Sequence, residues 1–215
     1  MDNVKSKNSK STGALIQKAT IAYRIRNSLY LNITNRCSNV CIFCPKFEKY
    51  KLHGNDLHLE AEPSFEEVIA AVQETAGIDE IVFCGFGESL IRLELVVRVA
   101  RELKKLYSYR IRINTDGQAN LVHGRNIISE LAGLVDCISV SLNASDSATY
   151  MQLCNTPFGL DGFSGVCEFI SAAKKQIPEV IASVVNLPEV DVNACKILVE
   201  SLGVSFRIRQ YKNER

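Results

Sequence analysis

Between residues 28 and 208 the sequence alternates six times between short apolar runs and amphipathic segments. The runs have the alternation or the β-branched content of strands, and the segments after them space apolar residues as helices do. Six such units in one register indicate parallel strands joined by right-handed crossovers. The pattern predicts an α/β protein, either a doubly wound open sheet or an incomplete barrel of six βα units. The predicted strands are 28–34, 80–84, 110–114, 137–142, 180–185 and 204–208.

The segments between these runs carry start and stop signals of helices. Ser64 precedes the first predicted helix, and Glu67 lies three residues after Ser64, which is the pattern of a capping box. Gly203 follows the last predicted helix, in the position that ends many helices. The predicted helices are 66–75, 90–106, 121–131, 146–153, 163–175 and 192–202.

The size and composition of the chain favour one folded domain. The 215 residues are 47% hydrophobic and carry a formal net charge of +1, so the charge predicts no global attraction to nucleic acid or membranes. Residues 1–20 are rich in Lys, Ser and Asn and predict a basic, disordered tail, which leaves 21–215 as the domain. No apolar run reaches 18 residues, and no signal-peptide core precedes the eight cysteines. We therefore expect a reducing, cytoplasmic location without membrane contact.

Three cysteines follow the first predicted strand at the spacing C-x3-C-x2-C: Cys37, Cys41 and Cys44. Three thiolates are one short of the four that usually hold a [4Fe–4S] cluster, which leaves one iron open to a small molecule. A structural zinc site needs a closed set of four ligands, and no fourth Cys or His follows at the usual spacing. The motif therefore favours a cluster over zinc.

The second predicted strand ends in a glycine-rich turn, Gly85-Phe86-Gly87-Glu88. Glycine permits close approach between the backbone and a ligand, and Glu88 would place a negative charge beside a bound cation. The alternative is a tight strand-to-helix turn, in which a Glu near the helix N-terminus is favoured by the helix dipole.

Polar residues also mark the ends of later strands. Alternation places Ser139, Ser141 and Asn143 on one face of the fourth strand, and Asn114 ends the third. These side chains either contact a polar ligand or belong to turn structure, in which the segment Asn143-Ala144-Ser145-Asp146 caps the next helix. Asp116, in the Asp-Gly pair after the third strand, is interpreted as a turn residue.

On the sixth strand Arg207 shares a face with Arg209. That face either points outward into solvent or lines the interior, where the two charges would need an anion.

Five cysteines lie outside the motif and form no close pair, so we interpret them as buried apolar thiols: Cys84, Cys137, Cys154, Cys167 and Cys195. Cys84, beside the glycine turn, and Cys137 are the candidates for a hydrogen-atom donor if the chain performs radical chemistry.

The cysteine motif and the glycine turn together resemble the radical SAM superfamily, which binds S-adenosylmethionine (SAM) at the open iron of a [4Fe–4S] cluster. The stretch from about 28 to 211 resembles one subgroup in particular, the radical SAM proteins associated with TatD-type deoxyribonucleases. The matching runs are CPKF (44–47), HGNDL (53–57), FCGFGE (83–88), NTDGQAN (114–120), SVSLN (139–143) and FRIR (206–209).

The resemblance implies a partial (β/α)6 barrel with cofactors at the carboxyl ends of the strands. It implies that the three motif cysteines hold the cluster. The residues that it assigns to SAM are Gly85, Phe86, Gly87, Glu88, Asn114, Ser139, Ser141, Asn143 and Arg207.

The implied reaction is reductive cleavage of SAM to a 5′-deoxyadenosyl radical, which abstracts hydrogen from an unidentified substrate. The electron would come from flavodoxin or ferredoxin. Alternatives are an activase that makes a glycyl radical on a partner protein, a deazapurine-type modifying enzyme, and a non-catalytic cluster- or SAM-binding accessory subunit of a TatD-type nuclease system.

Overall fold

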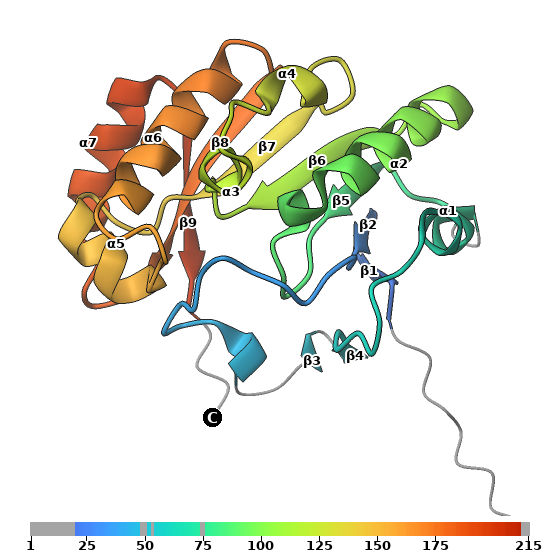
Figure 1. Cartoon of the computed structure of the whole chain (residues 1–215), viewed down its shortest axis with the longest axis horizontal. Helices are drawn as coiled ribbons and strands as arrows, with labels where there is room; N and C mark the ends of the chain where they lie inside the picture. The colour runs from blue at the N-terminus through green and yellow to red at the C-terminus, as the bar shows by residue number, and fades with distance from the viewer. Residues whose placement is uncertain (1–19, 48–50, 53, 74–75, 212–215) are drawn as a thin grey trace, which may run out of the picture.

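The computed structural model describes residues 20–47, 51–52, 54–73 and 76–211. Seven strands form one sheet in the order β1-β2-β5-β6-β7-β8-β9 (Figure 1). Every pairing from β2 to β9 is parallel, whereas β1 is antiparallel to β2. The strands are β1 (Ala22–Ile25), β2 (Ser28–Leu31), β5 (Glu80–Phe83), β6 (Arg110–Thr115), β7 (Cys137–Ser141), β8 (Glu179–Asn186) and β9 (Ser205–Gln210).

The helices lie along the outer side of the curved sheet (Figure 1). A doubly wound sheet would carry helices on both faces, so the arrangement matches the partial barrel, which is not closed because β1 and β9 are the two edges of the sheet. The helical elements are α1 (Phe65–Gln73), a 3-10 turn η2 (Ser89–Arg92), α2 (Leu93–Leu106), α3 (Ala119–His123), α4 (Ile128–Leu131), α5 (Ser147–Cys154), α6 (Asp161–Lys174) and α7 (Val192–Leu202).

The predicted α/β fold with six parallel strands is confirmed. The capping box at the first helix is also present, with the Glu67 amide 3.2 Å from Ser64 Oγ and the Ser64 amide 2.8 Å from Glu67 Oε2. None of the described helices is both long enough and apolar enough to cross a bilayer. The predicted tail falls almost wholly outside the described residues.

The single helix predicted at 121–131 is wrong, because the structure divides this stretch into α3 and α4. Gly124 ends α3 in the left-handed conformation, with φ of 62°. The Asn120 side chain then accepts a hydrogen bond from the Ile127 amide at 3.0 Å. Local side-chain bonds of this kind compete with a continuous helix.

Three short elements lie outside the predicted pattern. They are β1, a 3-10 turn η1 (Pro45–Phe47), and a small hairpin of β3 (Lys51–Leu52) and β4 (Asn55–Asp56) in the long connection after the cysteine motif. Leu57 and Leu59 in this connection are buried. Asn35 fixes it to the cysteine loop, because its side-chain amide bonds to the Leu59 carbonyl at 2.6 Å and to the Leu59 amide at 3.2 Å.

Strand alternation separates an apolar outer face from a polar inner face. Outward residues such as Leu31, Phe83, Ile113 and Val140 are fully buried in the core that packs against the helices. Burial of this kind contributes roughly 25 cal/mol per Å² and holds the helices on the sheet. The inner face carries polar and charged side chains instead: Tyr30, Glu80, Cys84, Arg112, Asn114, Ser139, Ser141, Ser183, Arg207 and Arg209.

Candidate functional site

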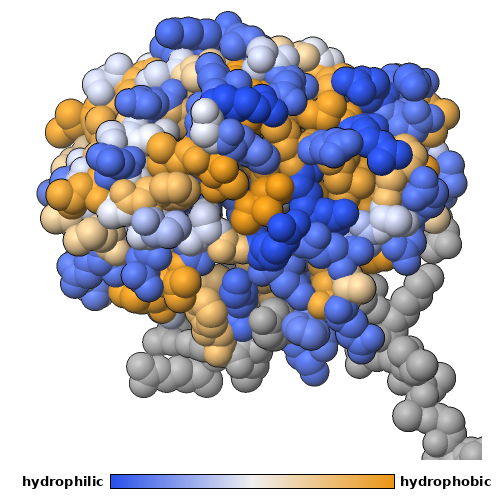
Figure 2. Space-filling model, viewed as in Figure 1, coloured by the Kyte–Doolittle hydropathy of each residue, from blue (hydrophilic) through white to orange (hydrophobic). Residues whose placement is uncertain are grey.

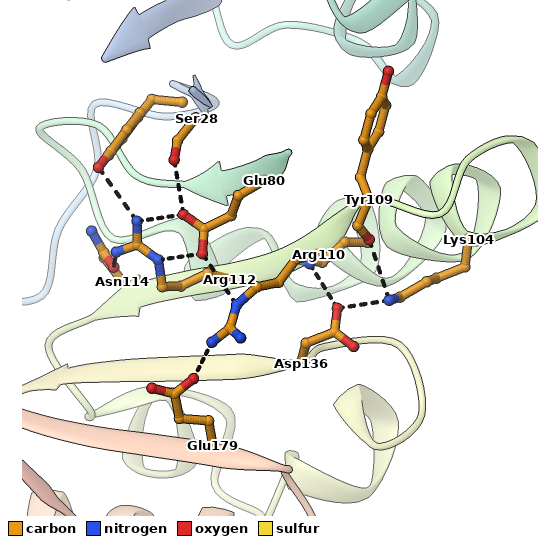
Figure 3. A network of polar contacts seen from close by, with 11 residues as sticks. Ser28, Glu80, Lys104, Tyr109, Arg110, Arg112, Asn114, Asp136 and Glu179 are labelled. Atoms are coloured by element: carbon orange, nitrogen blue, oxygen red, sulfur yellow. Dashed lines mark hydrogen bonds and ion pairs between the residues drawn. The ribbon is translucent and has the colours of Figure 1, made fainter. Parts of the chain in front are cut away.

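The inner face is closed near the amino ends of the strands by a network of ion pairs (Figure 3). Arg112 Nη2 lies 2.9 Å from Glu80 Oε2, and Arg112 Nη1 donates to Asn114 Oδ1 at 2.9 Å. Arg110 pairs with both Glu80 and Glu179. Each arginine in this network therefore has a carboxylate partner within the fold.

A cavity of about 200 Å³ opens at the other end of the inner face, beyond the carboxyl ends of the strands. In a sheet of parallel strands this is where ligands bind. Residues from five of the strands and from the cysteine loop line it: Cys37, Cys84, Gly85, Gly87, Glu88, Asn114, Thr115, Asp116, Ser139, Ser141, Ser183, Arg207 and Arg209.

The loop after β2, which carries the cysteine motif, is held against the C-terminal end of α5. The Val40 amide donates to the Cys154 carbonyl at 3.1 Å, and the Ile42 amide donates to the Leu153 carbonyl at 3.0 Å. These bonds use carbonyls that the end of a helix leaves without internal partners. The loop therefore has a defined position at the cavity edge.

The three motif cysteines are partly buried on this loop. Cys37 lines the cavity and its thiol lies 3.9 Å from Asp116 Oδ2. Burial, followed by the charge of Asp116, raises the pKa of Cys37. A hydrogen bond to Cys154, followed by burial, raises the pKa of Cys41, and burial raises the pKa of Cys44. Binding of a metal would therefore displace protons from these thiols.

No three His, Cys, Asp or Glu side chains within the described ranges are arranged around a point that could hold a single metal ion. A cubane cluster does not require its ligands to surround one point, because each thiolate binds a separate iron at a separate corner. Three thiols on one loop match a [4Fe–4S] cluster with one open iron, and the nearby Cys154 lies on α5, outside the motif. The donor set therefore fits the predicted cluster and does not fit mononuclear zinc.

The glycine turn packs against the start of the cysteine loop. A Cβ at Gly85 would overlap the side-chain oxygen of Asn32, and a Cβ at Gly87 would overlap the carbonyl oxygen of Thr34. Both glycines are therefore required for contact between two loops, and their predicted contact with a ligand stays a prediction. Phe86 does not line the cavity, because it packs in a small apolar cluster with Tyr23 and Leu57.

Glu88 is only 4% exposed and links two strand ends. Its carboxylate accepts hydrogen bonds from the Leu90 amide at 2.9 Å and from the Asp116 amide at 2.7 Å, so it caps η2 as the alternative interpretation expected. It also lines the cavity. Burial, and then the nearby charge of Asp116, raise the pKa of Glu88 well above its usual range.

Asp116 forms the second half of this acidic side of the cavity. Its Oδ1 accepts from the Gln118 amide at 2.9 Å and its Oδ2 accepts from the Ser38 hydroxyl at 2.8 Å. The sequence suggested only a turn at this Asp-Gly pair, so its place in the cavity was missed. The signal was present, because Asp116 follows the strand next to the one that ends in the glycine turn.

The polar face of β7 lies where alternation predicted it. Ser139 and Ser141 line the cavity, together with Ser183 from β8, which sequence reasoning missed. Asn143 is 3% exposed and has φ of 59°. The predicted cap of the next helix by the segment 143–146 is present, with Asp146 as the N-cap of α5.

Arg207 and Arg209 point inward from β9 and line the cavity. Of the two candidate hydrogen-atom donors, Cys84 also lines the cavity, whereas Cys137 begins β7 at the opposite end of the sheet. The structure thus brings together around the cavity Cys37, Cys84, Gly85, Gly87, Glu88, Asn114, the serines and both arginines. Phe86 and Cys137 lie apart, and Cys41, Cys44 and Asn143 are not among the residues that line the cavity.

The sequence profile of the radical SAM superfamily matches residues 31–200. The chain belongs to the radical SAM superfamily. Members of this superfamily typically use a [4Fe–4S] cluster and SAM, in agreement with the donor set of the cysteine loop. No curated protein sequence matches the chain.

Solved radical SAM structures share the fold. A radical SAM methyltransferase from Sphaerobacter thermophilus is 15% identical, with a TM-score of 0.54 over 88% of this chain and 68% of its own. Methylornithine synthase, PylB, is 16% identical, with a TM-score of 0.56 over 86% and 53%. HydG, a maturase of the [FeFe]-hydrogenase, is 17% identical, with a TM-score of 0.60 over 86% and 43%. The chain thus spans between about two fifths and two thirds of these proteins, and the likeness establishes the fold alone.

Proposed function

We propose that the chain is a radical SAM enzyme that holds a [4Fe–4S] cluster through Cys37, Cys41 and Cys44 and binds SAM in the adjoining cavity. The observation that carries the proposal is the position of the three cysteines. They lie on one loop at the carboxyl end of β2, and Cys37 lines a cavity to which five further strands contribute. The match of the superfamily profile to residues 31–200 supports it.

When bound, a reduced cluster held by Cys37, Cys41 and Cys44 would supply the electron for reductive cleavage of SAM and so for hydrogen abstraction from the substrate. The residues of the chain bind and orient the reactants. Glu88 and Asp116 lie on the acidic side of the cavity, where a bound ammonium group would be stabilised. Asn114, Ser139 and Ser141 provide neutral hydrogen-bonding groups on the facing strands, which suit the ribose hydroxyls. Cys84 is the cavity thiol that could donate a hydrogen atom.

The physiological partners follow from this chemistry. Reduction of the cluster needs a low-potential donor of the flavodoxin or ferredoxin type. The runs at 53–57 and 206–209 support the finer assignment to the TatD-associated subgroup, and we propose such a nuclease as a partner and the cytoplasm as the location. The substrate is not defined by the fold.

The first test is the iron content of cysteine variants after anaerobic reconstitution. We expect about four irons per wild-type chain and loss of most iron in Cys41→Ala. Cys154→Ala is the matched control, because Cys154 lies beside Cys41 at the end of α5 and is not a motif cysteine. Equal iron in Cys41→Ala and wild type, or zinc in place of iron, would contradict the proposal.

A second candidate, an activase acting on a partner protein, is favoured by exposed apolar side chains around the cysteine loop. Val40, Ile42 and Phe47 are 50%, 64% and 58% exposed. An apolar rim beside a cofactor suits contact with a macromolecule. Formation of 5′-deoxyadenosine by the isolated, reduced protein would support the enzyme that acts without a partner. Formation only after addition of a candidate partner would favour the activase, and its absence with every partner would favour the accessory subunit.

A further inference from the structure

Two arginines on β9 extend across the inner face toward β7. Arg207 Nη2 donates to Ser139 Oγ at 2.8 Å, and Arg209 Nη2 donates to Ser141 Oγ at 3.2 Å and to Asn143 Oδ1 at 3.0 Å. β8 lies between these strands, so both side chains cross it. The residue of β8 that pairs with Arg207 is Ser183, whose small side chain leaves room above the sheet.

Neither arginine has a carboxylate partner in the part of the chain that the structure describes. The groups that accept their hydrogen bonds are the neutral oxygens of two serines and one asparagine. The Nε of Arg209 is buried and has no acceptor among the described residues. Burial, and then the charge of Arg207, lower the pKa of Arg209. Arg209 is partly buried beside the exposed Arg207, and a partly buried cation next to a second cation is costly unless a ligand supplies the negative charge.

We propose that Arg207 and Arg209 form a subsite for a doubly charged oxyanion of the substrate, with a phosphate monoester as the best fit. This inference rests on the proposed function, because it names the substrate class of the same cavity. Two guanidinium groups present many N–H donors in planar forks that match phosphate oxygens. A phosphate monoester carries close to two negative charges at neutral pH and so balances both arginines.

SAM itself does not satisfy this requirement. It brings one carboxylate, which balances one positive charge and not two. In the binding mode that the family resemblance implies, that carboxylate also joins the amino group of SAM at the open iron. The acidic side of the cavity, Glu88 and Asp116, would repel an oxyanion, so the arginine side is where the substrate anion would lie.

The experiment is calorimetric titration of the cluster-loaded protein with inorganic phosphate and, separately, with succinate, in a phosphate-free buffer with and without SAM. We expect wild-type protein to bind phosphate, and Arg207→Gln and Arg209→Gln to bind it at least tenfold more weakly. Arg101→Gln is the matched control, because Arg101 is exposed on α2, and its affinity should equal that of wild type. Tighter binding of succinate than of phosphate would still support an oxyanion subsite, but the charged group of the substrate would then be a dicarboxylate and not a phosphate monoester.

Three results would overturn the proposal. The first is equal anion affinity in wild type and both variants, or binding of neither anion. The second is competition between SAM and phosphate together with a tenfold loss of SAM affinity in the variants, which would assign the arginines to the SAM carboxylate. The third is a shifted reduction potential of the cluster with unchanged anion binding, which would make the pair an electrostatic neighbour of the cluster.

Failure of the proposed function gives a different pattern. Protein that binds phosphate through the arginines but holds no iron and forms no 5′-deoxyadenosine would refute the cofactor assignment and leave the subsite intact. Circular dichroism checks the fold of each variant, and the exposed Arg207 provides the decisive variant if replacement of Arg209 prevents folding.

Discussion

The two ends of the inner face of the sheet differ in whether their arginines have carboxylate partners. Near the amino ends of the strands, Arg112 is paired with Glu80 and bonded to Asn114 (Figure 3). Near the carboxyl ends, Arg207 and Arg209 face only neutral acceptors among the described residues. Arginines at both ends alternate along one strand and share the inner face of the sheet, on β6 and on β9, so the difference lies in their partners.

The Glu80–Arg112 pair stabilises the fold, whereas Arg207 and Arg209 have charges that a ligand would balance. A buried ion pair that the chain completes by itself contributes to a unique packing, whereas an uncompensated charge lowers stability and persists where function requires it. The outer surface follows another pattern again, with hydrophilic side chains interspersed among apolar ones across the view in Figure 2. At the carboxyl end of the inner face, binding, and not folding, therefore explains Arg207 and Arg209.

The largest expected effect is on the paired end. Glu80→Gln removes the charge that balances Arg112, whose side chain is 12% exposed, and should lower the free energy of unfolding by about 3 kcal/mol. Arg209→Gln should change it by no more than about 1 kcal/mol, because the lost hydrogen bonds are offset by relief of repulsion from Arg207. Urea denaturation at neutral pH measures both. Equal losses in the two variants would mean that the fold already neutralises Arg209, and the contrast between the ends would fail.

The second prediction concerns whether close packing, and not charge, stabilises the fold at the cavity end of the sheet. Gly85→Ala should cost about 1–3 kcal/mol, because its Cβ would overlap Asn32 Oδ1. The Asn32 side chain has little freedom to move, since its amide donates to the Thr20 and Leu57 carbonyls at 3.0 and 2.9 Å.

A double-mutant cycle supplies the control for this prediction. In an Asn32→Ala background the added cost of Gly85→Ala should fall, because the overlapping oxygen is gone. An unchanged cost in that background would show that the two loops do not depend on this contact, and would leave the glycine free for the ligand role that the sequence suggested.

The sequence predicted the sheet well because strand alternation and apolar burial are local signals. All six parallel strands follow from alternation or from apolar runs, and a period of two places Ser139 and Ser141 on the same face. It failed at 121–131, where side-chain bonds from Asn120 and a left-handed Gly124 outweigh the apolar pattern.

The cavity was harder to predict than the sheet, because its composition depends on which strands become neighbours. Asp116 and Ser183 looked like a turn residue and an ordinary strand residue, and only the strand order brings them to the same rim. Whether Arg207 and Arg209 face inward could not be decided from a single strand, since alternation fixes which residues share a face and not which face is the interior.

The smallest expected effect is a difference in acid sensitivity between the two ends. Burial raises the pKa of Glu80. Its hydrogen bonds to Arg112 and Ser28 and the charges of Arg112 and Arg110 lower the pKa by a larger amount, so the net pKa lies below the usual value of 4.5. A carboxylate with a depressed folded-state pKa contributes stability above its unfolded pKa, and that contribution is lost as the pH falls through the folded-state pKa.

Arg209 does not titrate in this range, because an arginine stays charged even when burial lowers its pKa. Urea midpoints measured from pH 6 to pH 3 should therefore converge for wild type and Glu80→Gln, while Arg209→Gln follows the wild-type slope throughout. If Arg209→Gln instead removed the acid sensitivity, a carboxylate would have to pair with Arg209 in the folded protein, and the cavity end would be neutralised by the chain in the same way as the end at Glu80.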